Sequence, residues 1–325
     1  MPEGHSIHRL ARQFRDTFLG QSVRATSPQG RFAEGAALLD GHVPVESIAH
    51  GKHFFLTFDH RLTLNVHLGM YGAWTFGGDH TFTAASSIGA PRRIGEREIH
   101  RDPADPAHPR PDDGRSPSAG APGDAVAGRA AAEPPEPTPT TRVRLVTQHG
   151  WADLVGASIC RVLTPGEAET VRSGLGPDPL DPQADAGEFV RRASRTGRAI
   201  GAVLMDQSII AGVGNIFRAE TLFRQRIDPH RPARSLSDQD LRGLWEDLVL
   251  LMGIGVRRGR IITTAPEHRP GVPEAAAWPE HATYVYQRQG QTCLVCGTTT
   301  HDGDDAIVVE EMVQRKLYRC TVCQA

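Results

Sequence analysis

Two cysteine pairs near the C-terminus constrain the fold of this chain more than any other feature of its sequence. Cys293 and Cys296 form one CxxC pair, Cys320 and Cys323 form a second, and 23 residues separate the two pairs. Four thiolates on two short turns are a tetrahedral set typical of Zn²⁺, and a site closed by four protein ligands is structural. We therefore expect one structural zinc ion, no organic cofactor, and a C-terminal zinc finger over residues 283–325. A redox-active CxxC is the alternative, which two pairs at this spacing disfavour.

Length and composition indicate a globular protein with more than one domain. The chain has 325 residues, of which 39% are hydrophobic and 23% charged, as in proteins with an ordinary core. No uncharged apolar stretch reaches the roughly 18 residues that a membrane span needs, and the start MPEGHSIHRL lacks an apolar signal region. These observations exclude membrane and secreted classes, and we expect a cytoplasmic protein.

The net charge of −2 hides an uneven distribution of charge. Residues 77–141 carry 7 basic and 10 acidic residues, whereas residues 188–262 carry 13 arginines and 8 acidic residues. A local basic region favours a nucleic-acid partner more than the overall charge disfavours it. Lys52 and Lys316 are the only lysines among the 36 basic residues, which directs attention to their chemistry.

The first part of the chain reads as a helix followed by strands. Apolar residues recur at helical spacing over residues 5–19, and residues 62–70 alternate between apolar and polar, as in a half-buried strand. Residues 91–139 contain 11 prolines among 49 residues and no aromatic residue, which predicts disorder. Because strand signals resume at residue 141, we expect a disordered insertion over about 77–141 within a first domain of residues 1–150.

Helical patterns dominate after residue 150. We expect a second, helical domain over residues 151–280, with helices at 167–173, 188–194, 200–206, 215–226 and 237–258. Asn215 is a favoured N-cap, so it would begin its helix and leave the first-turn N–H groups pointing outward.

Pro2 and Glu3 have chemistry of their own. Removal of the initiator Met would expose a prolyl amine, and an α-amino group titrates near pH ~7.7–8.0, so part of it is an uncharged nucleophile at neutral pH. Attack of this secondary amine on an aldehydic carbon gives an iminium, and Glu3 beside it is placed to act as a general acid. Taken alone the pair indicates little, because many proteins begin with Met-Pro.

Five motifs in a fixed order carry a resemblance. They are MPEG at the start, GKHFF at 51–55, HLGMYG at 67–72, IAGVGNIFRAETLF at 210–223, and the two CxxC pairs ending in CQA. In this order they resemble the bacterial formamidopyrimidine-DNA glycosylase and endonuclease VIII family of DNA glycosylase/AP lyases. The resemblance covers the chain except about residues 77–141. It implies an α+β multidomain fold: an N-terminal β-sandwich with a flanking helix, a helix–two-turns–helix domain and a C-terminal zinc-finger β-hairpin.

The resemblance implies four catalytic residues. Pro2 matches the proline nucleophile that attacks C1′ of the damaged nucleotide, and Glu3 matches the acid that assists opening of the deoxyribose ring. Lys52 matches the lysine of the GKH motif, which contacts a backbone phosphate and supports elimination; a surface lysine at a strand start is the alternative. Arg315 matches the zinc-finger arginine that binds the phosphate next to the lesion, a task suited to its fixed donor fork.

The resemblance also implies five DNA-binding residues. Met70 and Tyr71 match the segment that fills the gap left by the flipped lesion; core packing is the alternative for Met70, whereas Tyr71 points to the other face. Asn215 matches a phosphate ligand, in a turn whose helix N-terminus also suits a phosphate. Arg218 falls where endonuclease VIII-like members carry an arginine, with an exposed helix arginine as the alternative. Lys316 adds charge beside the zinc-finger arginine.

Two departures from the family pattern stand out. Ser6 replaces the glutamate of the usual MPE-xx-E pattern, which leaves details of proton transfer open. The spacing between the cysteine pairs is longer than usual and includes the acidic segment HDGDD at 301–305, which we expect in a longer hairpin turn facing away from DNA.

The resulting hypothesis is a bifunctional DNA glycosylase/AP lyase that removes oxidised bases, with pyrimidines favoured, and cleaves by β,δ-elimination. Its expected partner is damaged double-stranded DNA, with single-stranded or bubble DNA as an alternative, and we expect a monomer located at the nucleoid when bound. Two other functions stay open: a lyase acting mainly on abasic or single-stranded sites, and a non-catalytic damaged-DNA-binding protein. The presence of Pro2, Glu3 and Lys52 disfavours the last.

Overall fold

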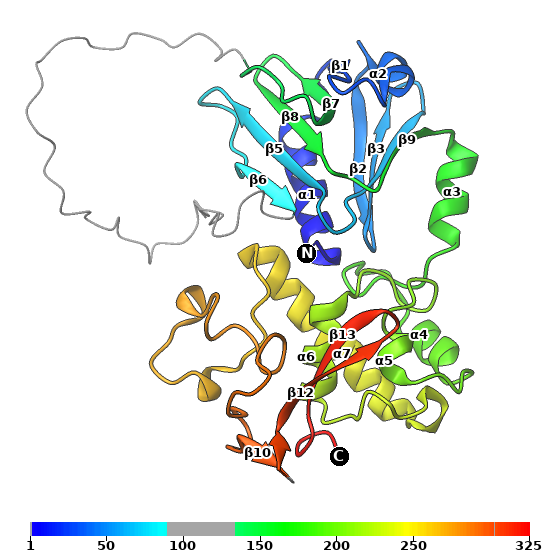
Figure 1. Ribbon diagram of the computed structural model, residues 1–325. Coiled ribbons are helices and arrows are strands. Elements are labelled where there is room, and N and C mark those ends of the chain that lie inside the picture. Colours follow the sequence, from blue (N-terminus) through cyan, green and yellow to red (C-terminus); the bar gives the residue numbers. More distant parts are fainter. Residues whose placement is uncertain (1, 90–133, 302) are drawn as a thin grey trace, which may run out of the picture.

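The computed structural model describes residues 2–89, 134–301 and 303–325 of the chain. It has a β-rich half, a helical half, and C-terminal hairpins that pack beside the helical half (Figure 1). The N-terminus lies where the β-rich half meets the helical half (Figure 1), so the first residues of the chain reach both. Within the described ranges, we find no helix whose length and apolar content would let it span a membrane. The arrangement confirms the α+β fold expected from the sequence.

The β-rich half is a sandwich of two antiparallel sheets. Its elements are α1 (Gly4–Thr17), β1 (Arg24–Thr26), α2 (Ala33–Leu39), β2 (Pro44–His50), β3 (His53–Phe58), β4 (Thr63–His67), β5 (Ala73–Gly78), β6 (Ser87–Gly89), β7 (Thr141–Val146), β8 (Gly150–Val155) and β9 (Ile159–Leu163). Among the described residues, one sheet has the order β1-β7-β8-β5-β6 and the other β2-β3-β4-β9. The inner faces of the two sheets share one hydrophobic core.

Helix α1 fixes the N-terminus to this core. Its apolar face, which includes Ile7, Leu10 and Phe14, is buried, and each such side chain contributes roughly 1.5–3 kcal/mol by burial. The Phe14 ring lies 4.9 Å from that of Phe54 and 5.0 Å from that of Trp74, centroid to centroid. The helix therefore holds the residues before it at a defined place between the two halves.

Strand β4 differs from the half-buried strand expected over residues 62–70. Its first four residues are all buried, because Leu64 and Val66 face the shared core while Asn65 on the other face donates to the Phe54 carbonyl at 3.2 Å. The strand ends at His67, and Gly69 turns the chain with φ +66.

Part of the segment 77–141, expected to be a disordered insertion, is ordered. Strand β6 within it pairs with β5, and the Phe82 ring packs 5.9 Å from that of Phe18; neither feature has a sequence signal of useful length. Residues 90–133, which hold most of the prolines, lie outside the described residues. Strands β8 and β9 extend the sandwich beyond residue 150, and the division into domains stays a proposal.

The helical half follows the expected helices closely. Its elements are α3 (Pro165–Ser173), α4 (Ala186–Ala193), α5 (Ile200–Val203), α6 (Asn215–Arg224) and α7 (Asp238–Arg258), with short 3₁₀ turns at Ala233–Ser235, Pro266–His268 and Glu274–Ala276. Helix α7 begins at a capping box between Ser237 and Asp240 and ends at Gly259 with φ 70, as capping rules predict. These helices enclose a second hydrophobic core.

In the C-terminal part, the described residues form two short hairpins. They are β10 (Thr300–His301) with β11 (Asp304–Asp305), and β12 (Ile307–Met312) with β13 (Arg315–Cys320). Val313 and Gln314 form the turn of the second hairpin with φ 55 and 57, the left-handed values of a type I′ turn. This turn pairs Met312 with Arg315, so Arg315 stands at the hairpin tip.

The second hairpin packs on helix α6. Phe223 of α6 shares a small hydrophobic cluster with Tyr284, Ile307 and Tyr318. The buried carboxylate of Glu220 accepts hydrogen bonds from the backbone N–H groups of residues 284, 285 and 286 at 2.7, 2.9 and 2.8 Å. Helix α6 therefore contacts both the segment before the first cysteine pair, at residues 284–286, and the β12–β13 hairpin.

Candidate active site

Three segments that are distant in the sequence meet where the two halves join. The Gly4 N–H donates to the Gly212 carbonyl at 2.9 Å, and Lys52 Nζ, in the turn between β2 and β3, donates to the Val213 carbonyl at 2.6 Å. Gly51 has φ +58, and a Cβ there would lie 2.9 Å from the Ala211 Cβ. Glycine is therefore required at Gly51 both for its backbone conformation and for the close approach.

The carboxylate of Glu3 caps the N-terminus of α6. It accepts hydrogen bonds from the N–H groups of Gly214 at 3.0 Å, Ile216 at 2.8 Å and Phe217 at 3.4 Å. A Cβ on Gly214 would lie 2.3 Å from the Glu3 carboxyl carbon, so only glycine fits. This contact fixes the adjacent Pro2 against the helical half, and an acidic group at a helix N-terminus is favourable.

Two expectations about this helix start are wrong. Gly214, not Asn215, is the N-cap, and Asn215 is the first helical residue. The N–H groups expected to face a phosphate instead donate to Glu3, because a buried carboxylate from the N-terminus occupies the position. The sequence pattern of the loop alone could not reveal a partner more than two hundred residues away.

Burial shifts the pKa values of Glu3 and Lys52 in opposite directions. Burial raises the pKa of Glu3, an effect that Lys52 and the backbone hydrogen bonds partly offset. Burial lowers the pKa of Lys52, which Glu3 partly offsets and Arg315 reinforces. Each group therefore favours its neutral form more than it would in water, which suits Glu3 to donate a proton.

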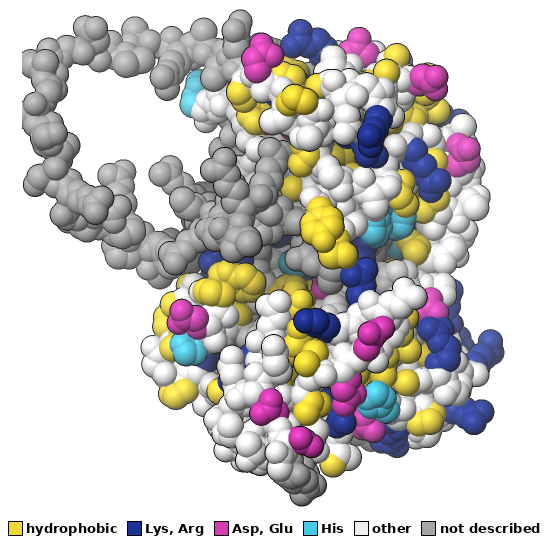
Figure 2. Space-filling model, in the orientation of Figure 1, with side chains coloured by type: hydrophobic (Ala, Val, Ile, Leu, Met, Phe, Trp, Pro, Cys, Tyr) yellow, Lys and Arg dark blue, Asp and Glu magenta, His cyan; other side chains and the backbone are white. Residues whose placement is uncertain are grey.

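A cavity of about 180 Å³ lies above this junction, and several of the expected site residues line it. They come from the N-terminus, the turn before β3, the turn after β4, the start of α6 and the hairpin tip: Pro2, Lys52, Met70, Asn215 and Arg315. Figure 2 shows hydrophobic and basic side chains together where the β-rich half meets the helical half.

Arg218 is not the exposed helix arginine considered as an alternative, since its side chain is fully buried. Its guanidinium donates to the carbonyls of Lys316 at 3.0 Å and Met312 at 3.4 Å, and to the Asn215 side chain. Burial lowers the pKa of Arg218 to about 10, so it stays charged at neutral pH. Arg218 thus binds the β12–β13 hairpin.

Asn215 binds the same hairpin. Its Nδ2 donates to the Lys316 carbonyl at 2.8 Å, and its own side chain is buried. Arg315 and the Lys316 side chain are exposed. The start of α6 therefore holds the hairpin backbone while the two basic side chains of its tip stay accessible.

Met70 and Tyr71 are exposed in the turn after β4. Met70 is 41% and Tyr71 76% exposed, so the alternative of core packing for Met70 is wrong. The strand ends before Met70, and the apolar stripe on which that alternative rested does not reach it.

The sequence did not indicate His67 or Asp178 as residues of the site. His67 lines the cavity, and its Nδ1 accepts from the Gly69 N–H at 3.1 Å, so in the neutral ring the proton is on Nε2. Buried Asp178 accepts from the Gly51 N–H at 2.7 Å and from His8 Nε2 at 2.8 Å, which ties the turn before Lys52 to α1. His67 lies inside the HLGMYG motif and was open to prediction, whereas Asp178 carries no such signal.

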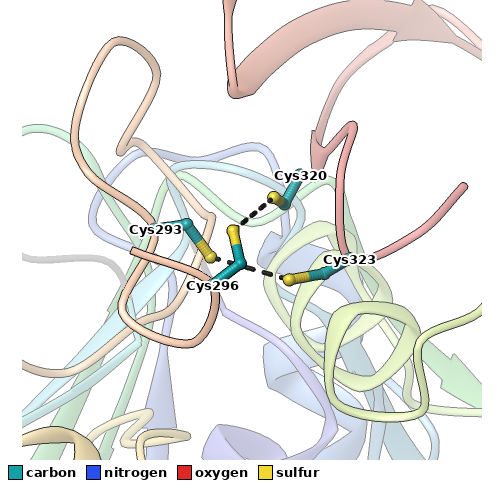
Figure 3. Close-up of side chains that lie close together, drawn as sticks. All are labelled: Cys293, Cys296, Cys320 and Cys323. Carbon is teal, nitrogen blue, oxygen red and sulfur yellow. Dashed lines mark hydrogen bonds between the residues drawn. The ribbon is translucent and has the colours of Figure 1, made fainter. Parts of the chain in front are cut away.

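The four paired cysteines form a cluster beside the hairpins (Figure 3). Their sulfur atoms all lie within 4.8 Å of one another, with Cys293–Cys323 at 3.8 Å and Cys296–Cys320 at 3.9 Å. A zinc ion bound by four thiolates at about 2.3 Å places the sulfurs roughly 3.8 Å apart. The donor set and its spacing therefore fit a single zinc ion.

The sequence matches two protein-family models and several known proteins. The N-terminal domain of formamidopyrimidine-DNA glycosylase matches residues 1–151, and the H2TH domain of formamidopyrimidine-DNA glycosylase matches residues 175–267. The chain is 38% identical to Endonuclease 8 1 of Mycobacterium tuberculosis over 325 residues, 100% of both chains. It is also 40% identical over 124 residues to the formamidopyrimidine-DNA glycosylase of Geobacillus kaustophilus, covering 38% of this chain and 44% of that one.

Solved structures of formamidopyrimidine-DNA glycosylases have the same fold as this chain. The MutM (Fpg) protein of Thermus thermophilus superposes with a TM-score of 0.65 at 24% identity and covers 99% of this chain and 98% of that one. The Lactococcus lactis Fpg in complex with DNA containing an abasic site superposes with a TM-score of 0.66 at 16% identity, covering 99% of each chain. With its full-length relative, its two matching domains and this shared fold, the chain belongs to the formamidopyrimidine-DNA glycosylase and endonuclease VIII family, whose members are DNA glycosylases with AP lyase activity.

Proposed function

We propose that this chain is a bifunctional DNA glycosylase/AP lyase that uses the Pro2 amine as its nucleophile. One observation carries the proposal: Pro2, Lys52 and Arg315 line a single cavity although they are far apart in the sequence. Pro2 comes from the N-terminus, Lys52 from the turn between β2 and β3, and Arg315 from the start of β13. The buried Glu3 carboxylate beneath them fixes Pro2 against α6. Family membership supports the same activity.

The proposed reaction begins at the N-terminus. After removal of Met1, the Pro2 nitrogen attacks C1′ of the damaged nucleotide, and the bond from C1′ to the base breaks with its electron pair leaving on the base. The attacking nitrogen gives up its proton, which neutralises the departing base, and so regains a lone pair. Glu3 then gives its own proton to the ring oxygen as the C1′–O bond opens, and the nitrogen lone pair forms the iminium. The raised pKa of Glu3 supports this role because burial makes the carboxyl group hold its proton more readily than in water.

Elimination follows from the iminium. Electron withdrawal by C=N⁺ acidifies C2′–H, so loss of this proton forms the C2′=C3′ double bond and expels the 3′ phosphate. This double bond in turn acidifies C4′–H, and loss of that second proton expels the 5′ phosphate. Lys52 lies in the cavity, a position that supports contact with a phosphate, and its lowered pKa supports assistance to these proton transfers.

DNA is held by the rim of the cavity. Arg315 and Lys316 at the hairpin tip contact phosphates next to the lesion, and His67 Nε2–H and Asn215 add polar contacts inside the cavity. Met70 and Tyr71 enter the stack vacated by the flipped nucleotide, which their exposure supports, and an inserted apolar side chain recovers part of the cost of base extrusion. We place this activity in the cytoplasm, where the DNA is.

The zinc ion serves structure in this proposal. Cys293, Cys296, Cys320 and Cys323 would hold it, and four thiolates leave no open position for a water nucleophile. Bound zinc supplies a rigid cross-link between the two cysteine turns, and Arg315 stands on the strand that ends at Cys320.

Oxidised pyrimidines are the proposed substrates. The full-length identity to a protein named Endonuclease 8 1, against partial matches to formamidopyrimidine-DNA glycosylases, supports the endonuclease VIII side of the family.

Borohydride trapping on a panel of oligonucleotides tests the proposal. We expect covalent adducts with duplexes carrying an abasic site or an oxidised pyrimidine, and weaker trapping with an oxidised purine. Pro2→Gly should sharply reduce the adduct, and a matched preparation that retains Met1 should give none. Equal trapping by the Met1-retaining protein would overturn the nucleophile, and trapping on the abasic site alone would replace the glycosylase with a lyase.

A further inference from the structure

A second cluster of metal-ligating side chains lies at the far end of the β-sandwich from the active site. Among the described residues, His42, Asp59 and His60 each place one ligand atom within 4.8 Å of the others. His42 precedes β2, and Asp59 and His60 form the turn between β3 and β4. Because β3 has six residues and Lys52 precedes it, the two sites lie roughly 20 Å apart.

The two imidazole rings share one carboxylate oxygen. His42 Nδ1 lies 2.8 Å and His60 Nδ1 lies 3.5 Å from Asp59 Oδ1. The rings are stacked, with centroids 3.7 Å apart and an angle of 9° between their planes.

The hydrogen bonds fix the tautomer of His60. Its Nε2 lies 2.9 Å from the Leu38 carbonyl, and a carbonyl can only accept, so Nε2 bears the hydrogen. In the neutral ring Nδ1 therefore carries a lone pair, and this buried atom has no hydrogen-bond partner among the described residues. A lone pair that faces an anionic carboxylate oxygen is unfavourable unless a positive charge lies between them.

We propose that His42, Asp59 and His60 bind a divalent zinc ion through the two Nδ1 atoms and the Asp59 carboxylate. Imidazole and carboxylate are ordinary ligands of Zn²⁺. Metal-ligating histidines usually donate their other N–H to a carbonyl, as His60 does to Leu38. The ion replaces the proton that His42 Nδ1 shares with Asp59, and the two rings turn out of their parallel stack so that both Nδ1 lone pairs point at the ion.

The three side chains are partly exposed to solvent. His42 is 39%, Asp59 45% and His60 24% exposed, so water completes the coordination and the ion exchanges with solvent. By joining the loop before β2 to the β3–β4 turn, bound zinc would stabilise this end of the sandwich.

Zinc titration of the untagged protein, already loaded with one zinc at its four cysteines, tests the proposal. Calorimetry should detect one further equivalent of Zn²⁺, and added zinc should raise the Tm. H42Q/H60Q should abolish the further equivalent and the Tm shift, and Asp59→Asn should weaken binding by more than about tenfold. The control is His149→Gln, which breaks a surface pair of the same kind, His149 with Asp79 at 2.9 Å, and should leave both readouts unchanged.

Borohydride trapping on abasic DNA checks that the variants fold, since all should trap as the unaltered protein does. If H42Q/H60Q fails this check, His60→Gln alone replaces it, because the glutamine amide can still donate to Leu38. The proposal is overturned if the unaltered protein takes up no further zinc. It is also overturned if the histidine variants take up zinc as the unaltered protein does.

Discussion

Replacing Arg218 by methionine should weaken DNA binding although Arg218 does not reach solvent. Its side chain is fully buried, and its guanidinium donates to the carbonyls of Lys316 and Met312 at 3.0 and 3.4 Å. Methionine fills the aliphatic part of the same space but has no donor, so the variant removes the Arg218 hydrogen bonds to the β12–β13 hairpin and leaves those of Asn215 in place. Arg315 at the hairpin tip then loses its fixed position at the cavity.

The magnitude follows from these contacts. A hydrogen bond from a charged donor contributes about 1.5–3 kcal/mol, and relief from desolvation of the buried guanidinium offsets part of the loss. We therefore expect Arg218→Met to lower the free energy of unfolding by about 1–3 kcal/mol. If it acts through Arg315, its effect on DNA affinity should approach that of Arg315→Ala, about 1.5–3 kcal/mol or roughly 10- to 150-fold in Kd.

A double-mutant cycle measures this coupling. Binding of Arg218→Met, Arg315→Ala and the double variant to a lesion duplex should show that Arg218→Met costs less than about 0.5 kcal/mol once Arg315 is absent. Arg224→Met is the control, since Arg224 lies on the same helix but binds Asp247 at 2.8 Å; it should not couple to Arg315. Additive losses from Arg218→Met and Arg315→Ala would refute the reasoning and indicate that Arg218 touches DNA itself.

Three further predictions concern stability and metal. Burial lowers the pKa of His5 from its ordinary 6.5 to about 3, so the folded state should lose about 1.4 kcal/mol per pH unit as the pH falls through this window; denaturation at several pH values should show a flatter profile for His5→Gln, and an unchanged profile contradicts the assignment. Cys320→Ser should lose zinc and DNA affinity together, whereas Arg315→Ala should keep zinc, lose affinity and lower the salt slope by about one phosphate contact; undiminished affinity in Arg315→Ala would refute its role. Glu220→Gln should lower the free energy of unfolding by about 2–4 kcal/mol, because the Glu220 carboxylate accepts three backbone N–H groups at residues 284–286. Chemical denaturation measures this change, and a denaturant midpoint equal to that of the unaltered protein would contradict the prediction.

Local patterns explain how much of the fold was predictable. Helix α1 follows hydrophobic periodicity, and the long helix α7 follows periodicity together with its caps. Both signals act over a few residues, and the expected bounds of the two helices are within a residue or two of the observed ones. The cysteine cluster was likewise predictable, because two short turns already limit its geometry. The short strand β6 was not, since three residues carry no useful period.

The contacts that build the candidate site were not predictable for a different reason. Glu3 accepts from the start of α6, Arg218 binds a hairpin some hundred residues later, and Asp178 holds the turn before Lys52. Each depends on how elements distant in the sequence dock, which periodicity and local propensity do not encode. The motifs indicated which residues matter, and the docking decides whether they face DNA or each other.

The proposed reaction depends on the Pro2 amine as nucleophile, but the cavity is lined by a second amine, that of Lys52. Pro2 and Lys52 line the same cavity, and burial lowers the pKa of Lys52, so either could in principle form an iminium with an abasic site. Mass-spectrometric mapping of the borohydride-reduced adduct distinguishes them most directly. We expect the deoxyribose remnant on the N-terminal peptide, at the nitrogen of Pro2, with Lys52 unmodified. An adduct on Lys52, or an adduct that persists when Met1 is retained, would contradict it.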